Sequence, residues 1–168
     1  MPNEAHWYFA YGSNMQAATF RGRRALEPLE ARVGLLDGYA LRFDIPVGPG
    51  LRGVANLAVE PASFVWGVLY LLRPEQHEHL DRTEGVPSGL YRRIPVAIRC
   101  GDEVVAAETY ISEIRDAGRL PSHRYLGLLL DGAREHGLPA SWIATLEAWT
   151  LAFDEREGAS NPPGAVAR

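Results

Sequence analysis

Apolar residues along the chain are grouped in short runs typical of β-strands, separated by turns that contain glycine or proline. The first run, residues 7–11, is rich in aromatic side chains and predicts a buried strand that ends at Gly12, Ser13 and Asn14. Residues 32–45 alternate between apolar and polar around the turn dipeptide Asp37-Gly38, which predicts a β-hairpin.

Three further strand signals follow in the middle of the chain. The apolar runs 53–59 and 64–72 are separated by residues 60–63, Glu-Pro-Ala-Ser, and predict two antiparallel strands joined by that connection. Residues 91–111 alternate on both sides of a Gly-Asp turn at positions 101 and 102, which predicts a second hairpin.

Helical patterns occur between the strands and toward the end of the chain. Residues 15–24 predict a short helix, and Pro74 begins a polar helical stretch that runs to Thr83. Ser122 can cap a helix that continues to residue 135, and Pro139 begins another. This last helix carries apolar residues at helical spacing, namely Ile143, Leu146, Trp149 and Leu151.

Strands followed by helices gathered mainly near the C-terminus predict an α+β domain, with a mixed sheet that closes into a small β-barrel flanked by helices. We expect residues 1–156 to form this single domain. Residues 157–168 are rich in Gly, Pro, Ala and Ser, bury little, and predict a flexible C-terminal tail.

Composition narrows the possible partners and location. The chain has 168 residues, 46% of them hydrophobic, and a formal charge of −4, so neither nucleic acid nor an anionic membrane is favoured over a small-molecule partner. It has no lysine, which excludes a Schiff-base mechanism, and its single cysteine, Cys100, excludes an internal disulfide or a thiolate zinc site. The first residues lack a secretory pattern and no apolar run reaches membrane-spanning length, so we expect a cytoplasmic protein.

Two positions could carry chemistry. The corner at Gly12, Ser13 and Asn14 places backbone N–H groups where they can hold an anion or a developing oxyanion, although such a cluster can also merely turn the chain. Glu84 lies between a polar helix and Gly85, so its carboxylate is either aimed inward, where it could act as base and then acid, or exposed at a helix end. A serine hydrolase is rejected, because the corner lacks the second glycine of a nucleophile elbow.

Other polar residues give weaker signals. His77 and His79 would face apart on a helix, so we expect a solvated surface there and no metal. The arginines near residues 21–24 and 92–93 are expected to be solvated, although one could bind a substrate carboxylate. Five tyrosines either line a pocket or belong to the core with their hydroxyls at its rim: Tyr8, Tyr11, Tyr91, Tyr110 and Tyr125.

Three separated motifs, in this order and spacing, resemble the γ-glutamylcyclotransferase (AIG2-like) family. They are Tyr-Phe-Ala-Tyr-Gly-Ser-Asn at 8–14, Val-Trp-Gly-Val at 65–68 and Glu-Gly-Val-Pro-Ser-Gly-Leu-Tyr at 84–91. The similarity continues through 122–125 and 132–139, so it covers nearly the whole chain except its tail.

The resemblance implies a small mixed barrel with flanking helices, in which Glu84 moves protons. It also implies a substrate-binding set, to which Tyr91 would add by shaping the pocket: Tyr8, Phe9, Ala10, Tyr11, Gly12, Ser13 and Tyr125. The implied reaction closes a γ-glutamyl group onto its own α-amine, releasing 5-oxoproline and a free amine without a cofactor or metal.

Several alternatives stay open. The same reaction could serve another γ-glutamyl compound, and the same fold could be a non-catalytic small-molecule-binding module or, less favoured, an interaction protein. The sequence does not distinguish a monomer from a homodimer, nor does it identify the preferred amine.

Overall fold

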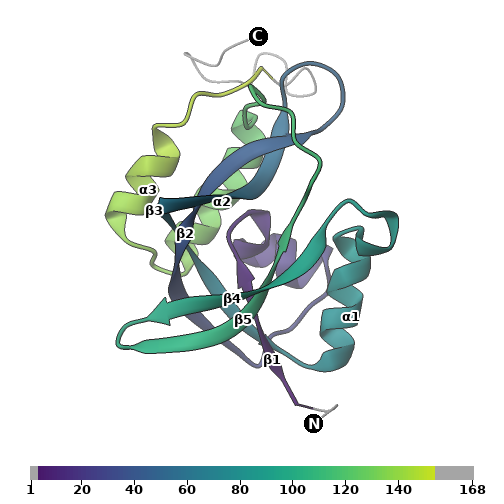
Figure 1. Ribbon diagram of the computed structural model, residues 1–168, viewed down its shortest axis with the longest axis vertical. Helices are drawn as coiled ribbons and strands as arrows, with labels where there is room; N and C mark the ends of the chain where they lie inside the picture. The colour runs from purple at the N-terminus through teal and green to yellow at the C-terminus, as the bar shows by residue number, and fades with distance from the viewer. Residues whose placement is uncertain (1–3, 154–168) are drawn as a thin grey trace.

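Five β-strands close into a barrel in the order β1, β3, β2, β4 and β5, and helices lie around it (Figure 1). The computed structural model describes residues 4–153, so the predicted tail and the domain end at residue 156 lie outside the described residues. The strands are β1 (His6–Ala10), β2 (Glu30–Pro46), β3 (Gly53–Leu72), β4 (Arg92–Cys100) and β5 (Glu103–Ile111). All neighbouring strands are antiparallel except β1 and β5, which confirms the expected α+β fold with a mixed barrel.

Short and long helices connect and cover the strands. They are the 3₁₀ turn η1 (Ser13–Met15), the π-helical turn η2 (Ala18–Arg23), α1 (Pro74–Thr83), the 3₁₀ turn η3 (Val86–Ser88), α2 (His123–Glu135) and α3 (Ala140–Glu147). Figure 1 shows α1 on one side of the barrel and α2 with α3 on the other. None of the helices within residues 4–153 has both the length and the apolar character needed to cross a membrane.

The predicted hairpin over residues 32–45 is wrong, because β2 is one continuous strand. Gly38 adopts a φ of +82° at a break in the register, where Asp37 pairs with Phe64 and Tyr39 pairs with Val59. A glycine with positive φ permits a β-bulge as readily as a tight turn. The long partner strand β3 continues past this point, so the chain bulges and does not reverse.

The two predicted strands at 53–59 and 64–72 are likewise halves of the single strand β3. Both halves pair with β2, and residues 60–63 stand opposite Gly38 without pairing partners of their own in the ladder. Pro61 lacks an N–H, and an unpaired bulge is one of the few places in a sheet where a proline is tolerated. The predicted reversal is therefore wrong for the same reason as the hairpin in β2.

The other local predictions are confirmed in outline. The hairpin of β4 and β5, helix α1 and helix α2 form as expected, and the Ser122 Oγ caps α2 by accepting a hydrogen bond from the Tyr125 N–H at 3.1 Å. Residues 15–24 are divided between η1 and η2 and do not form one α-helix. Helix α3 ends at Glu147, so Trp149 and Leu151 lie beyond it.

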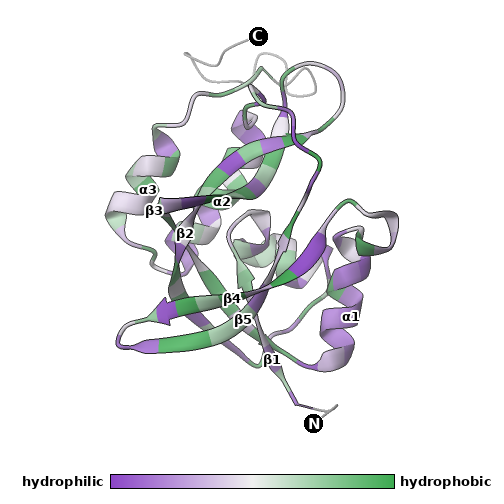
Figure 2. Ribbon diagram, viewed as in Figure 1, coloured by the Kyte–Doolittle hydropathy of each residue, from purple (hydrophilic) through white to green (hydrophobic). Residues whose placement is uncertain are grey.

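The hydrophobic core joins the barrel to the turns that follow β1. Phe20 of η2 stacks on Tyr70 of β3 with ring centroids 4.2 Å apart, and Tyr70 donates through its hydroxyl to the Asn14 carbonyl at 2.9 Å. Helix α1 is mostly hydrophilic in Figure 2 and buries only His77 and Leu80. The turn η1 is therefore fixed from the side of β3 by aromatic packing and by a hydrogen bond.

Helix α2 fixes the same turn from the opposite side. At Gly132 a Cβ atom would lie 2.5 Å from the backbone carbonyl carbon of Met15, closer than real Cβ contacts allow. Gly127, one and a half turns earlier in the helix, has nothing within 4 Å of its Cβ position.

We predict that Gly132→Ala lowers the free energy of unfolding by about 2 kcal/mol, because the added methyl group must push α2 away from η1. Gly127→Ala is the matched control and should raise it by about 0.5–1 kcal/mol, since alanine is the better helix former in open space. Urea unfolding of both variants measures the difference. Equal effects of the two substitutions would contradict this account of the contact.

Candidate active site

A cavity of about 330 Å³ lies where the end of β1, the start of β3, the end of α1 and the start of α2 meet. This volume is within the range of small-molecule sites. Its lining includes a glycine-serine-asparagine corner, one carboxylate, several arginines and five tyrosines: Gly12, Ser13, Asn14, Glu84, Arg23, Arg24, Arg52, Arg124, Tyr8, Tyr11, Tyr91, Tyr110 and Tyr125.

Local backbone geometry places Glu84 in this cavity. Glu84 is the C-terminal cap of α1, and Gly85 follows with a φ of +70°, a conformation that ends helices and favours glycine. The chain then turns through η3, and the Leu90 N–H donates to the Gly85 carbonyl at 3.1 Å. Of the two placements that the sequence left open, the structure has the inward-facing one, with Glu84 only 9% exposed.

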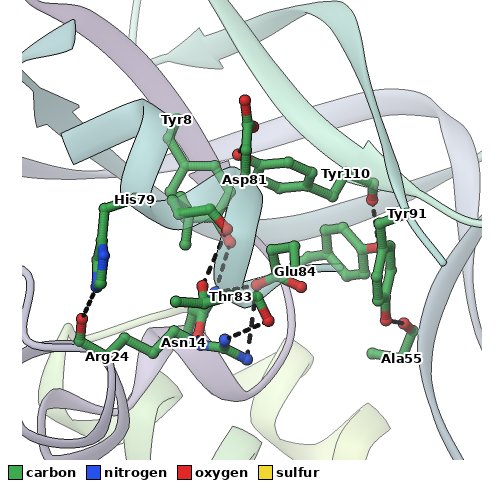
Figure 3. Close-up of polar contacts among 12 residues, drawn as sticks. Tyr8, Asn14, Arg24, Ala55, His79, Asp81, Thr83, Glu84, Tyr91 and Tyr110 are labelled. Carbon is green, nitrogen blue, oxygen red and sulfur yellow. Dashed lines mark hydrogen bonds and ion pairs between the residues drawn. The ribbon is translucent and has the colours of Figure 1, made fainter. Parts of the chain in front are cut away.

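Asn14 connects Glu84 to the first strand. Its amide nitrogen Nδ2 donates to the Glu84 Oε1 at 2.8 Å and to the Tyr8 hydroxyl at 2.9 Å (Figure 3). The Arg24 Nε donates to the Asn14 Oδ1 at 2.6 Å, and the Arg24 Nη2 lies 3.6 Å from the Glu84 Oε1. The side chain of Asn14 thus touches three polar groups of the site.

The environment of Glu84 changes its acidity. Burial raises the pKa of its carboxyl group above the ordinary glutamate value, whereas the nearby Arg24 charge and the hydrogen bond from Asn14 lower it, with burial dominant. A carboxyl group whose pKa is raised can accept and release a proton within one reaction more readily than an ordinary one. The site therefore has a group suited to acid–base catalysis.

The five tyrosines left ambiguous by the sequence all line the cavity. Two of them bind the backbone of one residue in β3: the Tyr91 hydroxyl donates to the Ala55 carbonyl at 2.9 Å, and the Ala55 N–H donates to the Tyr125 hydroxyl at 3.0 Å. The Tyr11 hydroxyl donates to the Tyr110 carbonyl at 2.6 Å. Burial raises the pKa of Tyr125 to about 12, so at neutral pH its hydroxyl stays protonated and can donate a hydrogen bond.

The substrate-binding set predicted from the family resemblance divides into two groups. Tyr8, Tyr11, Gly12, Ser13 and Tyr125 line the cavity. Phe9 and Ala10 are completely buried in the core and are not among its lining residues.

Sequence reasoning missed the side chains of Asn14 and Arg24. Asn14 belongs to the glycine-serine-asparagine corner that was singled out, but the prediction used only the backbone of that corner. Arg24 is one of three arginines within four residues, and no local pattern distinguishes it from its neighbours.

The expected solvated surface at His77 is wrong. His77 is buried, and its Nε2 lies 3.1 Å from the His6 carbonyl, because this face of α1 packs against β1. His79 is half-buried and its Nε2 lies 2.8 Å from the Arg24 carbonyl. Over the part of the chain that the structure describes, no group of three or more potential metal ligands is found.

The chain is thus a small mixed β-barrel protein with a buried carboxylate and tyrosine hydroxyls around a cavity of small-molecule size. Residues 64–146 match the AIG2-like family. The chain is 30% identical over 151 residues to the γ-glutamylcyclotransferases of Bos taurus and of Homo sapiens, covering 86% of this chain and 79% of each relative. A solved γ-glutamyl cyclotransferase superposes with a TM-score of 0.77 at 27% identity, covering 87% of this chain and 88% of the other. The chain belongs to the AIG2-like, γ-glutamylcyclotransferase family.

We predict that Glu84→Gln stabilises the protein at pH 7. A carboxyl group whose pKa is raised by folding binds its proton more tightly in the folded state, so its contribution to stability falls as pH rises from the unfolded pKa through the folded one. The neutral amide of glutamine avoids the cost of burying a charged carboxylate. The gain in stability over the wild type should vanish as pH approaches 4. Thermal unfolding from pH 4 to 8 measures the stability difference, with Glu78→Gln at an exposed position of the same helix as control. A loss of stability at pH 7 that persists at pH 4 would contradict the prediction.

Proposed function

We propose that this protein is a γ-glutamylcyclotransferase that converts a γ-glutamyl amino acid or amine into 5-oxoproline and the free amine. One observation carries the proposal: a chain of this family holds Glu84 buried at a cavity, with its pKa raised. The partner is then a small γ-glutamyl compound, and the chemistry needs proton transfer but no cofactor.

In the proposed reaction Glu84 takes a proton from the α-ammonium group of the substrate. The freed amine attacks the γ-carbonyl carbon and closes a five-membered ring. As the bond between that carbon and the leaving nitrogen breaks, Glu84 returns the proton to the departing amine, and the ring nitrogen gives up its second proton by the same route. The nucleophile and the electrophile belong to one molecule, so holding the glutamyl chain folded can supply an effective molarity of about 10⁵ M or more.

The oxygen of the γ-carbonyl becomes negatively charged while the ring closes. The N–H groups of Gly12 and Ser13, together with the Tyr125 hydroxyl, are the donors proposed to stabilise it, and a donor of this kind contributes about 3 kcal/mol. Gly12 keeps this space open, because its Cβ would lie 3.2 Å from the Ala55 Cβ and 3.4 Å from the Tyr125 hydroxyl. A side chain at position 12 would therefore crowd the place where the substrate carbonyl is expected.

A non-catalytic binding module is less well supported by the same geometry. A receptor for an ammonium group needs only an ionised carboxylate and gains nothing from a raised pKa, whereas burial raises the pKa of Glu84 above the ordinary glutamate value. A raised pKa suits a group that changes its protonation state during a reaction.

We predict that Glu84→Gln lowers the rate of 5-oxoproline formation by about 10²- to 10⁴-fold and leaves substrate binding nearly unchanged. Glutamine keeps the shape of the side chain but cannot accept a proton. Glu78→Gln, an exposed change on the same helix, should match the wild type. The measurement is mass spectrometry of 5-oxoproline from a panel of γ-glutamyl dipeptides and amines. Near-normal turnover by Glu84→Gln would contradict the mechanism, and silence of the wild type across the panel would favour a binding role.

A further inference from the structure

The side chain of Arg24 contacts Glu84 and two of its neighbours, Asn14 and Thr83. Its Nε donates to the Asn14 Oδ1 at 2.6 Å, and its Nη1 donates at 3.1 Å to the carbonyl of Thr83, the residue that precedes Glu84. Its Nη2 lies 3.6 Å from the Glu84 Oε1, and the side chain of Arg24 is 21% exposed. Figure 3 shows the guanidinium beside Asn14 and Glu84. These contacts span two segments that are sixty residues apart in sequence.

The first contact fixes the orientation of the Asn14 amide. A guanidinium can only donate, so the Asn14 atom facing Arg24 must be the carbonyl oxygen Oδ1. Both protons of Nδ2 then point to the other side, where one is donated to the Tyr8 hydroxyl and the other to Glu84. An ionised Glu84 can only accept and therefore requires the same orientation of the amide, whereas a protonated Glu84 can also donate, so Arg24 keeps this orientation in both protonation states.

The two oxygens of Glu84 are consequently different. Oε1 accepts the hydrogen bond from Asn14 and lies next to the Arg24 cation. Oε2 has no hydrogen-bond partner within residues 4–153. Glu84 is part of the cavity lining. The protein therefore holds Oε1 and makes no hydrogen bond to Oε2 within the described residues.

We propose that Arg24 is a positioning residue for the cyclisation: acting through Asn14, it holds Oε1 of Glu84 and leaves Oε2 as the oxygen that exchanges protons with the substrate. This inference rests on the function proposed above.

Arg24 is also the charged group that most affects Glu84. Four other titratable groups interact electrostatically with Glu84. They are Tyr8 of β1, Tyr11 after β1, Tyr91 before β4 and Tyr125 of α2. Burial raises the pKa of each of these tyrosines, so all four are neutral near pH 7. Removing the Arg24 charge should therefore raise the pKa of Glu84 further.

The test compares the pH dependence of kcat/KM for the wild type, Arg24→Gln, Arg24→Lys and Arg21→Gln on a γ-glutamyl dipeptide that the wild type converts. In Arg24→Gln we expect the acidic limb to move to higher pH, with kcat lower by about 10- to 100-fold and KM little changed. Arg24→Lys should return the acidic limb toward its original position while kcat stays low. The ammonium group restores the charge but cannot make the three contacts of the planar guanidinium. Arg21→Gln removes the same charge from the same turn at an exposed position and should match the wild type.

An unmoved limb with normal kcat in Arg24→Gln would overturn the proposal. So would a raised KM with normal kcat, because Arg24 would then bind the substrate itself. Circular dichroism checks folding, and if Arg24→Gln does not fold, normal kcat in Arg24→Lys overturns the proposal.

A second measurement does not depend on turnover. In protein labelled with ¹³C at its glutamate carboxyl groups, the resonance missing from Glu84→Gln identifies Glu84, and its titration should shift upward in Arg24→Gln. An unshifted titration overturns the proposal, whereas a wild type that forms no 5-oxoproline overturns the proposed function.

Discussion

Burying a carboxylate is strongly unfavourable unless the protein replaces the water that it loses, and at Glu84 two residues far away in the chain supply that replacement. Asn14 supplies a hydrogen bond across seventy positions, and Arg24 supplies a positive charge across sixty. The replacement is incomplete, because the pKa of Glu84 is still raised. In the proposed reaction this raised pKa suits Glu84 to act as base and then as acid, so stability and the proposed chemistry oppose each other at this position.

The barrel makes this arrangement possible because the C-terminal half of β3 positions three segments: β1, the corner that follows β1, and α1. Tyr8 of β1 pairs with Tyr70 of β3, and α1 begins two residues after β3 ends. Tyr70 then holds the Asn14 carbonyl, so the register between β1 and β3 also sets the position of the corner after β1. A one-residue slip of this pairing would turn the Tyr8 side chain to the other face of the sheet and break the network.

Local patterns were sufficient for the elements whose form depends on nearby residues. The aromatic strand β1, the hairpin of β4 and β5, and helices α1 and α2 are all readable from alternation, turn dipeptides and capping residues. The Asp37-Gly38 dipeptide misled because the choice between a turn and a bulge depends on a distant partner strand. The motifs at 8–14 and 84–91 located the cavity.

The side-chain contacts within the site could not be predicted from local sequence patterns. The side-chain contacts of Asn14 and Arg24 with Glu84 join residues sixty or more positions apart, and nothing in the local sequence marks one arginine of three as the partner of a carboxylate. The burial of His77 escaped notice for a similar reason, since the polar character of α1 says little about which of its faces meets β1.

Intramolecular ring closure at Glu84 is the central claim, and isotope incorporation tests it directly. The wild type would act on a γ-glutamyl dipeptide in water enriched in ¹⁸O, with the products analysed by mass spectrometry. Ring closure predicts 5-oxoproline without ¹⁸O and no free glutamate, because water takes no part in breaking the bond. Glutamate carrying ¹⁸O in its γ-carboxyl group would show hydrolysis and contradict the account.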